Sequence, residues 1–153
     1  MRKPIAACAL IAASLAAASP ARACDTHPAD IYFAPGSASL DDKAREEIRH
    51  QASIRTAIMD EGSRIRLTAY GDRAGEGWAN LRLSRRRAEA VRTELARRGV
   101  HPSRVDIVSR GEASLPVPTK DGEEEAKNRV VNVANLAASE VSKQNPVVGC
   151  GGL

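Results

Sequence analysis

The sequence predicts one α/β sandwich, in which two helices cover one face of a four-stranded sheet in the order β-α-β-α-β-β. Two long segments have apolar residues at helical spacing, and four short segments have the composition or alternation of strands. Glycine or proline separates most of these segments. Helical crossovers favour parallel pairing of the strands that they join, and the long final connection permits either sense.

Residues 30–35 predict a short strand, which ends at Pro35-Gly36. A helix follows over residues 39–59, with Ser39 or Asp41 as its N-terminal cap. The glycine that follows it closes the helix. The apolar residues at helical spacing in this segment are Ala44, Ile48, Ala52, Ile54 and Ile58.

Residues 64–69 alternate polar and apolar side chains and predict the second strand. A loop with three glycines connects this strand to a second helix over residues 78–98, which Gly99 closes. Residues 104–109 and 129–134 predict the last two strands, on either side of a long acidic connection.

The second helix has a predicted buried stripe. At 100° per residue, its apolar side chains lie within about 40° of a common centre. We expect Trp78 to fill the core beside this stripe, with a place in the wall of a groove as the alternative. The residues of the stripe are Leu81, Ser84, Ala88, Val91 and Leu95.

The first 23 residues have the pattern of a secretion signal. Two basic residues precede an alanine-rich apolar run, and Ala21-Arg22-Ala23 gives a small-x-small cleavage pattern. We therefore expect residues 1–23 to be a signal peptide. Residues 24–153 then form one exported domain, with its core at about 31–134 and a short C-terminal tail. An uncleaved N-terminal anchor is the alternative.

Removal of this leader changes the charge of the chain. The formal net charge falls from +4 to +1, because three of the 23 Lys and Arg residues leave while all 19 Asp and Glu residues remain. The chain also has only one Phe, two Tyr and one Trp. It therefore lacks both the basic excess and the stacking surface of a nucleic-acid-binding protein.

Cys24 and Cys150 are the two cysteines of the expected mature chain. In an oxidising compartment, we expect them to form a disulfide that joins its two ends. Two unpaired thiols are the first alternative. Lipidation of Cys24 is the second, although Ala21-Arg22-Ala23 lacks the leucine that usually stands three residues before a lipidated cysteine.

The histidines do not form a catalytic or metal-binding pattern. His27, His50 and His101 lie far apart in the chain and lack metal-ligand spacing. We therefore expect a protein that is not an enzyme and that needs no metal or other cofactor.

Asp72 and Arg87 are the candidate binding residues. Asp72 follows the second strand near the start of the second helix, and neighbouring glycines let this loop bend closely. Arg87 lies about 80° from the centre of the buried stripe and about 20° from Asn80, so both lie on the flank facing a possible groove. A carboxylate facing a guanidinium suits a small zwitterion such as an amino acid. The alternative is a simple surface ion pair between Asp72 and Arg87.

The spacing of these residues resembles that of the OmpA-like peptidoglycan-binding domain, which also occurs in Pal and MotB proteins. That family has the pattern G-H-T-D-x-x-G followed by Y-N-x-x-L-S-x-x-R-A. This chain has Asp72-x-x-Gly75 and then Asn80-x-x-Leu83-Ser84-x-x-Arg87-Ala88 at matching spacing. The resemblance covers about residues 31–134. Further matches are Phe33, Ser37-Ala38-x-Leu40, Gly111-Glu112, Pro118-Thr-x-Asp-Gly122 and Asn128-Arg129-x-Val131.

The resemblance implies non-covalent binding of peptidoglycan through meso-diaminopimelate in its peptide stem. Asp72 would accept hydrogen bonds from the ligand ammonium, Arg87 would hold a ligand carboxylate, and Asn80 would donate to the ligand or to the loop. Such a protein would connect the periplasm or the outer membrane to the wall. Another envelope protein is a second partner to consider.

The chain departs from the family pattern at several pocket positions. Tyr70-Gly71 replaces His-Thr, Ala79 replaces Tyr, and Val130 replaces the second Arg of N-R-R-V. These departures leave an alternative open: a periplasmic protein–protein adaptor that keeps the fold without binding the ligand.

Overall fold

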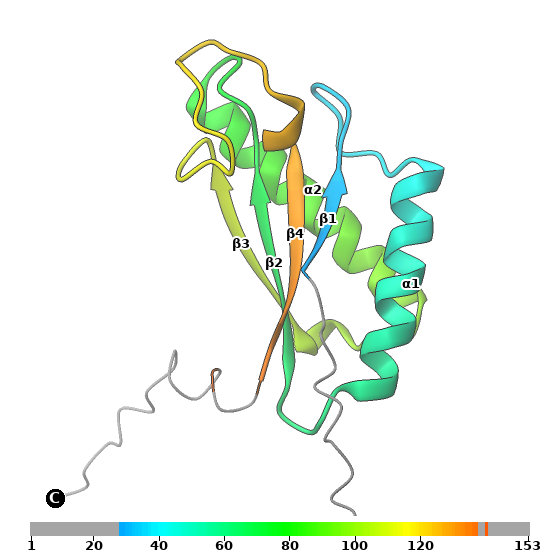
Figure 1. Cartoon of the computed structure of the whole chain (residues 1–153). Coiled ribbons are helices and arrows are strands. Elements are labelled where there is room, and N and C mark those ends of the chain that lie inside the picture. The colour runs from blue at the N-terminus through cyan, green and yellow to red at the C-terminus, as the bar shows by residue number, and fades with distance from the viewer. Residues whose placement is uncertain (1–27, 138–139, 141–153) are drawn as a thin grey trace, which may run out of the picture.

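The computed structural model describes residues 28–137 and residue 140. The expected signal peptide and the Cys24–Cys150 pairing lie outside the described residues. The predicted order of strands and helices is confirmed, with two short 3₁₀ helices added (Figure 1). The elements are β1 (Ala29–Tyr32), α1 (Asp42–Ile58), β2 (Arg64–Tyr70), α2 (Gly77–Arg97), η1 (Pro102–Arg104), β3 (Val105–Gly111), η2 (Ala126–Asn128) and β4 (Val130–Leu136).

The four strands form one mixed sheet in the order β1-β4-β2-β3. β2 and β3, which α2 connects, pair in parallel. β4 lies between β1 and β2 and is antiparallel to both. The carboxyl ends of β1 and β2 therefore meet the amino end of β4 at one end of the sheet, where the candidate site lies.

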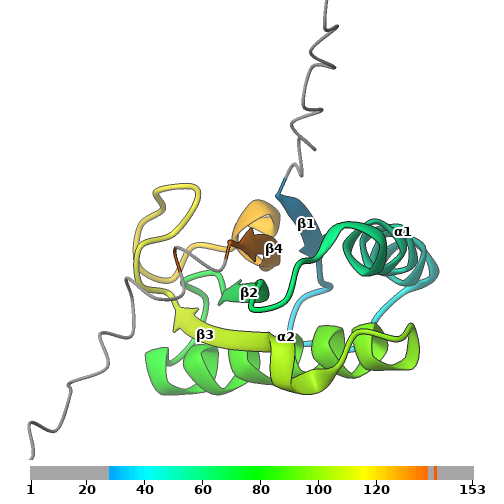
Figure 2. The same cartoon turned by 90° about the horizontal axis from the view of Figure 1, so that it is seen from below.

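Both helices pack on one face of the sheet, as predicted (Figure 2). Alternation along β2 points Ile65, Leu67 and Ala69 into the core, while the residues between them are only partly buried. Val131 and Val133 of β4 are buried in the same core. The helices complete the core with Ala44, Ile48, Ala52, Ala88, Val91 and Leu95.

The ends of both helices have identifiable causes. Of the two predicted caps for α1, Asp41 is the one used, because its carboxylate accepts a hydrogen bond of 2.7 Å from the Ala44 amide. α1 ends at Ile58, so Gly62 belongs to the turn before β2 rather than to the helix end. At the end of α2, Gly99 adopts a φ of 93°, and its amide donates to the Ala96 carbonyl.

Two predictions for the start of α2 are wrong. Trp78 is 63% exposed and Leu81 is 47% exposed, whereas the other predicted members of the stripe are buried. The periodicity of a helix defines a face, but not how far the sheet extends beneath that face. At this end α2 meets the sheet at its outermost strand, β3, where Gly111 lies against the Leu81 backbone. The Trp78 ring instead lies under the Arg82 guanidinium, 5.6 Å from its centroid.

Candidate functional site

The candidate site lies on the loops at one end of the sheet. Figure 1 shows that the segments following β1 and β2 and the segment preceding β4 gather at this end. Phe33, Asp72 and Arg129 come from these three segments, and Arg87 reaches them from α2. Residues far apart in the sequence are therefore brought together by the sheet topology.

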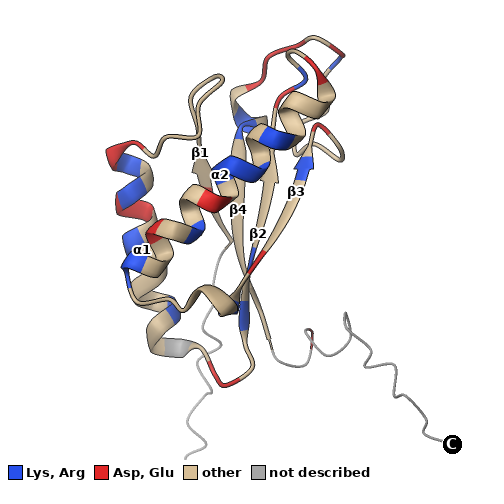
Figure 3. Ribbon diagram, turned by 180° about the vertical axis from the view of Figure 1, so that it is seen from behind, with Lys and Arg blue, Asp and Glu red and all other residues tan. Residues whose placement is uncertain are grey.

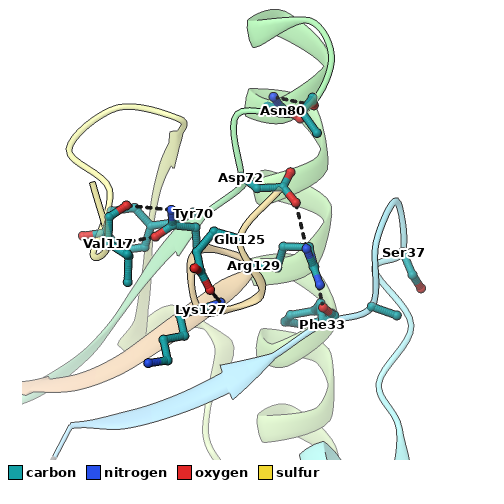
Figure 4. A network of polar contacts seen from close by, with 12 residues as sticks. Phe33, Ser37, Tyr70, Asp72, Asn80, Val117, Glu125, Lys127 and Arg129 are labelled. Carbon is teal, nitrogen blue, oxygen red and sulfur yellow. Dashed lines mark hydrogen bonds and ion pairs between the residues drawn. The ribbon is translucent and has the colours of Figure 1, made fainter. Parts of the chain in front are cut away.

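Asp72 forms an ion pair with Arg129. The Arg129 Nη1 atom lies 2.9 Å from Asp72 Oδ2, and Figure 4 shows the two side chains pointing toward each other. The Arg129 Nε atom donates to the Phe33 carbonyl at 3.3 Å, so this arginine also holds the end of β1. The side chains of Asp72 and Arg129 are 13% and 11% exposed, so the pair is mostly buried but still in contact with solvent.

Arg87 is anchored to backbone rather than presented to solvent. Its Nε atom donates to the Ser37 carbonyl at 2.8 Å, and its Nη2 atom donates to the Ala34 carbonyl at 3.1 Å. Nη1 lies 3.4 Å from the Tyr70 carbonyl, which makes a third and longer contact. The guanidinium also stacks on the Phe33 ring, 5.4 Å from its centroid. Arg87 thereby joins the loop after β1 to the end of β2.

Burial has a clear effect on the Arg87 guanidinium. Desolvation lowers its pKa to about 10, the nearby Asp72 carboxylate opposes this shift, and Arg129 adds to it. Arg87 is still charged at neutral pH. It is 1% exposed, so its predicted position on the open flank of α2 is wrong. The loop over residues 34–37 covers that flank, and a helical projection contains no information about such a loop.

Asn80 holds the loop between β2 and α2. Its Nδ2 atom donates to the Ala74 carbonyl at 3.1 Å and to Glu112 Oε2 at 3.2 Å. Of the two partners expected for Asn80, the structure shows the loop, and a contact with a ligand stays a prediction. Asn80 is buried, and Figure 4 shows its side chain on α2, apart from the Asp72–Arg129 pair.

Three polar residues of this region were not predicted as functional residues. Arg129 pairs with Asp72, Glu112 accepts from Asn80, and Asn128 holds the long loop before β4. The Asn128 side chain both donates to the Val117 carbonyl, at 2.8 Å, and accepts from the Val117 amide, at 2.9 Å. All three belong to the Gly111-Glu112 and Asn128-Arg129 matches, which were the available signal in the sequence.

The predicted alternative of an ion pair between Asp72 and Arg87 does not describe this arrangement. Across residues 28–137, the only ion pair that Asp72 forms is with Arg129. Arg87 acts on Asp72 through the electrostatic field instead. The same stretch contains no cluster of three His, Cys, Asp or Glu side chains that could hold a metal ion. No helix in this part of the chain has the length and hydropathy to span a membrane.

The fold and the site define a small α/β sandwich domain with a charged site on the loops at one end of its sheet. The chain belongs to the OmpA family, whose model matches residues 32–129. This membership confirms the resemblance inferred from the spaced motifs.

Two curated relatives place this membership in context. The chain is 33% identical over 104 residues to a peptidoglycan-associated lipoprotein of Pseudomonas putida, a match that covers 67% of this chain and 60% of that protein. It is also 33% identical over 110 residues to an outer membrane protein of Gluconacetobacter diazotrophicus, covering 67% of this chain and 28% of the relative. The chain therefore matches less than two thirds of the length of either relative.

Solved structures share the same fold. The peptidoglycan-associated lipoprotein from Burkholderia pseudomallei superposes with a TM-score of 0.63 at 26% identity, covering 70% of this chain and 89% of that one. The C-terminal domain of Helicobacter pylori MotB gives a TM-score of 0.64 at 20% identity, covering 78% and 94% of the two chains. The second likeness concerns the fold alone.

Proposed function

We propose that this protein binds cell-wall peptidoglycan non-covalently through the meso-diaminopimelate of the peptide stem, and so connects the periplasm or the outer membrane to the wall. The observation that carries this proposal is the Asp72 carboxylate, held beside two guanidinium groups at a partly open position. Membership of the OmpA family and the names of the peptidoglycan-associated relatives support it.

The charges of the site suit the zwitterionic end of diaminopimelate. Asp72 Oδ2 is occupied by Arg129, whereas Oδ1 has no protein donor among the residues that the structure describes. We assign Oδ1 to the ligand ammonium. Two guanidiniums face one carboxylate, so the site has one excess positive charge for the ligand carboxylate.

The two arginines have different roles in this proposal. Arg87 donates to backbone carbonyls through all three of its nitrogen atoms, so its main contribution is to fix the loop and supply positive potential. Arg129 uses Nε and Nη1, and in the described part of the chain its Nη2 atom has no protein acceptor. We therefore place the ligand carboxylate on the Arg129 side, with a remaining N–H of Arg87 as a second donor.

The expected affinity for one stem is low. Two charge-assisted hydrogen-bond contacts contribute roughly 1.5–3 kcal/mol each, or about 3–6 kcal/mol together. That free energy corresponds to a dissociation constant from millimolar to tens of micromolar. Because the wall presents many identical stems, a tethered or clustered binder would still be retained.

Retention on purified sacculi tests the proposal. We expect the full chain to sediment with sacculi whose stems carry meso-diaminopimelate, and Asp72→Asn to remain in the supernatant. Asp121→Asn is the matched control, because Asp121 forms an exposed ion pair with Arg73 outside the site. Equal sedimentation of the wild type and Asp72→Asn would contradict the proposed site.

A second comparison tests the ligand. Sacculi whose stems carry lysine in place of diaminopimelate lack the second carboxylate, and we expect much weaker retention on them. We also expect no soluble fragments to be released during the incubation, since the proposed activity is binding without cleavage. Equal retention on both walls would remove diaminopimelate as the recognised group.

A protein–protein adaptor that does not bind the wall is the second candidate function. One observation favours it: Arg87 is buried and donates three hydrogen bonds to backbone carbonyls, so fewer of its five N–H groups remain for a ligand. The departures at Tyr70-Gly71 and Val130 point the same way. Under this alternative, the folded wild-type chain would fail to sediment with either kind of sacculus.

A further inference from the structure

A separate groove lies between α2 and the outer strand β3. It encloses about 510 Å³ and shares no residue with the Asp72 site. Leu81 and Ile107 supply apolar surface, and Ser109 lines the strand side. We infer that this α2/β3 groove binds an extended acidic segment of a partner protein, which adds a strand to the edge of the sheet at β3.

The charge of the groove determines the chemistry of its occupant. Arg82, Arg85 and Arg92 line it together with a single acidic residue, Glu89. Glu89 pairs with Arg92 at 2.6 Å, and Arg82 lies over the exposed ring of Trp78. Arg85 is exposed and, among residues 28–137, forms no ion pair. The groove thus has two positive charges in excess, and Figure 3 shows the basic positions along α2.

The strand edge determines the conformation of the occupant. β3 is the last strand of the sheet and pairs only with β2 in the described structure. Its other side presents backbone N–H and C=O groups in the arrangement that an added strand requires. Ile107 and Ser109 are two residues apart, so they project on the same side of the sheet, toward α2.

The dimensions of the groove fit this mode of binding. Arg85 and Arg92 are seven positions apart on a helix, about 10 Å along its axis. Alternate side chains of a strand are about 7 Å apart, so two or three of them span the arginine row. We therefore expect acidic residues at alternate positions around one apolar residue, which would lie against Leu81 and Ile107. A polyanion without a peptide backbone would gain nothing from the strand edge.

The test uses the full chain and an acetylated, amidated peptide of sequence Thr-Glu-Thr-Leu-Thr-Glu-Thr. We expect it to slow hydrogen exchange of β3 amides at least tenfold at saturation, and to change the emission of Trp78, the one tryptophan of the chain. Arg85→Glu should weaken binding at least tenfold. Arg86→Glu is the matched control: it makes the same charge change at an exposed neighbour that does not line the groove. Asp72→Asn should bind the peptide like the wild type, which separates this result from the sacculus experiment.

Six results would overturn the inference. Binding without protection of β3, equal weakening by Arg85→Glu and Arg86→Glu, or equal binding of a peptide with lysine in place of glutamate would exclude a specific acidic strand. Tighter, Arg85-dependent binding of heparin would identify an anionic polymer as the occupant. Concentration-dependent self-association in sedimentation, abolished by Arg85→Glu, would identify a second copy of this chain. Absence of any peptide binding would leave the groove without the proposed role.

Discussion

Asp72 and Arg129 form an ion pair at 2.9 Å that joins the loop after β2 to the residue before β4. The two residues are 57 positions apart in the sequence. Arg129 also donates to the Phe33 carbonyl, so one side chain connects three segments of the candidate site. The same pair therefore orients the carboxylate proposed for ligand binding and holds the loops around it.

Replacement of Arg129 by glutamine should destabilise the fold and weaken wall retention together. The change leaves Asp72 largely buried without its cationic partner, and loss of such a hydrogen bond costs about 1–3 kcal/mol. Urea unfolding measures this change in the free energy of unfolding. Arg73→Gln, which breaks the exposed pair with Asp121, should cost less than about 1 kcal/mol. Equal decreases in the free energy of unfolding of the two variants would mean that the Asp72–Arg129 pair stabilises the fold no more than an exposed ion pair does.

Replacement of Arg87 by methionine should cost about 3 kcal/mol or more, because the Ser37, Ala34 and Tyr70 carbonyls lose their donor together. Methionine keeps the apolar stem, so thermal and urea unfolding report mainly on the missing guanidinium. Arg86→Met, at the exposed neighbouring position, should change stability by about 0.5 kcal/mol or less. A stable Arg87→Met variant would contradict the anchoring role. Because loss of the Arg87 guanidinium is expected to destabilise the fold, substitution of Arg87 is unsuitable as a test of ligand binding.

The sequence was sufficient to predict the elements of this fold, because helical spacing and strand alternation are local signals. It could not specify that β4 enters between β1 and β2, since that order depends on pairing between distant segments. Burial of Arg87 was missed for a related reason. A hydrophobic pattern assigns arginine to the surface, whereas this guanidinium is satisfied by carbonyls of a loop 50 residues away.

The candidate site was predicted in composition more than in geometry. Spaced motifs identified Asp72, Asn80 and Arg87, and the structure brings Asp72 and Arg87 close enough for an electrostatic effect. The actual partner of Asp72 is Arg129, which the sequence marked only as part of a motif. For Trp78 the error has the opposite sign: the sequence predicts a core residue, and the structure leaves this side chain exposed.

Gly111 should tolerate no side chain. Its φ of 56° is unfavourable for other residues, and an added Cβ would lie 3.0 Å from the Leu81 Cα atom. The Leu81 backbone nitrogen would lie 3.1 Å from the same Cβ. Because both of these Leu81 atoms belong to the backbone, Gly111→Ala should displace α2 from β3 and cost about 2 kcal/mol or more. Gly122→Ala is the control, since Gly122 has a φ of 81° but no atom within 4 Å of the added Cβ. Its cost should be about 1 kcal/mol, from backbone strain alone. Equal costs in urea unfolding would show that the close approach at Gly111 is relieved.

Glu94 should make the stability of the fold sensitive to acid. Hydrogen bonds from Arg98, at 2.8 and 3.0 Å, and a longer one from Arg97 lower its pKa, against the opposing effect of burial. The folded state therefore binds this proton less readily than the unfolded state, whose glutamate has the ordinary value of 4.5. The stabilisation is fully present above that value and is lost as the pH falls through the lower folded-state pKa.

Glu94→Gln should consequently reduce the midpoint of thermal unfolding at pH 7. The difference in midpoint between this variant and the wild type should shrink as the pH falls below 4.5. The exposed Glu124→Gln should show no such convergence, and a constant gap for Glu94→Gln at all pH values would mean that the charge of Glu94 does not stabilise the fold.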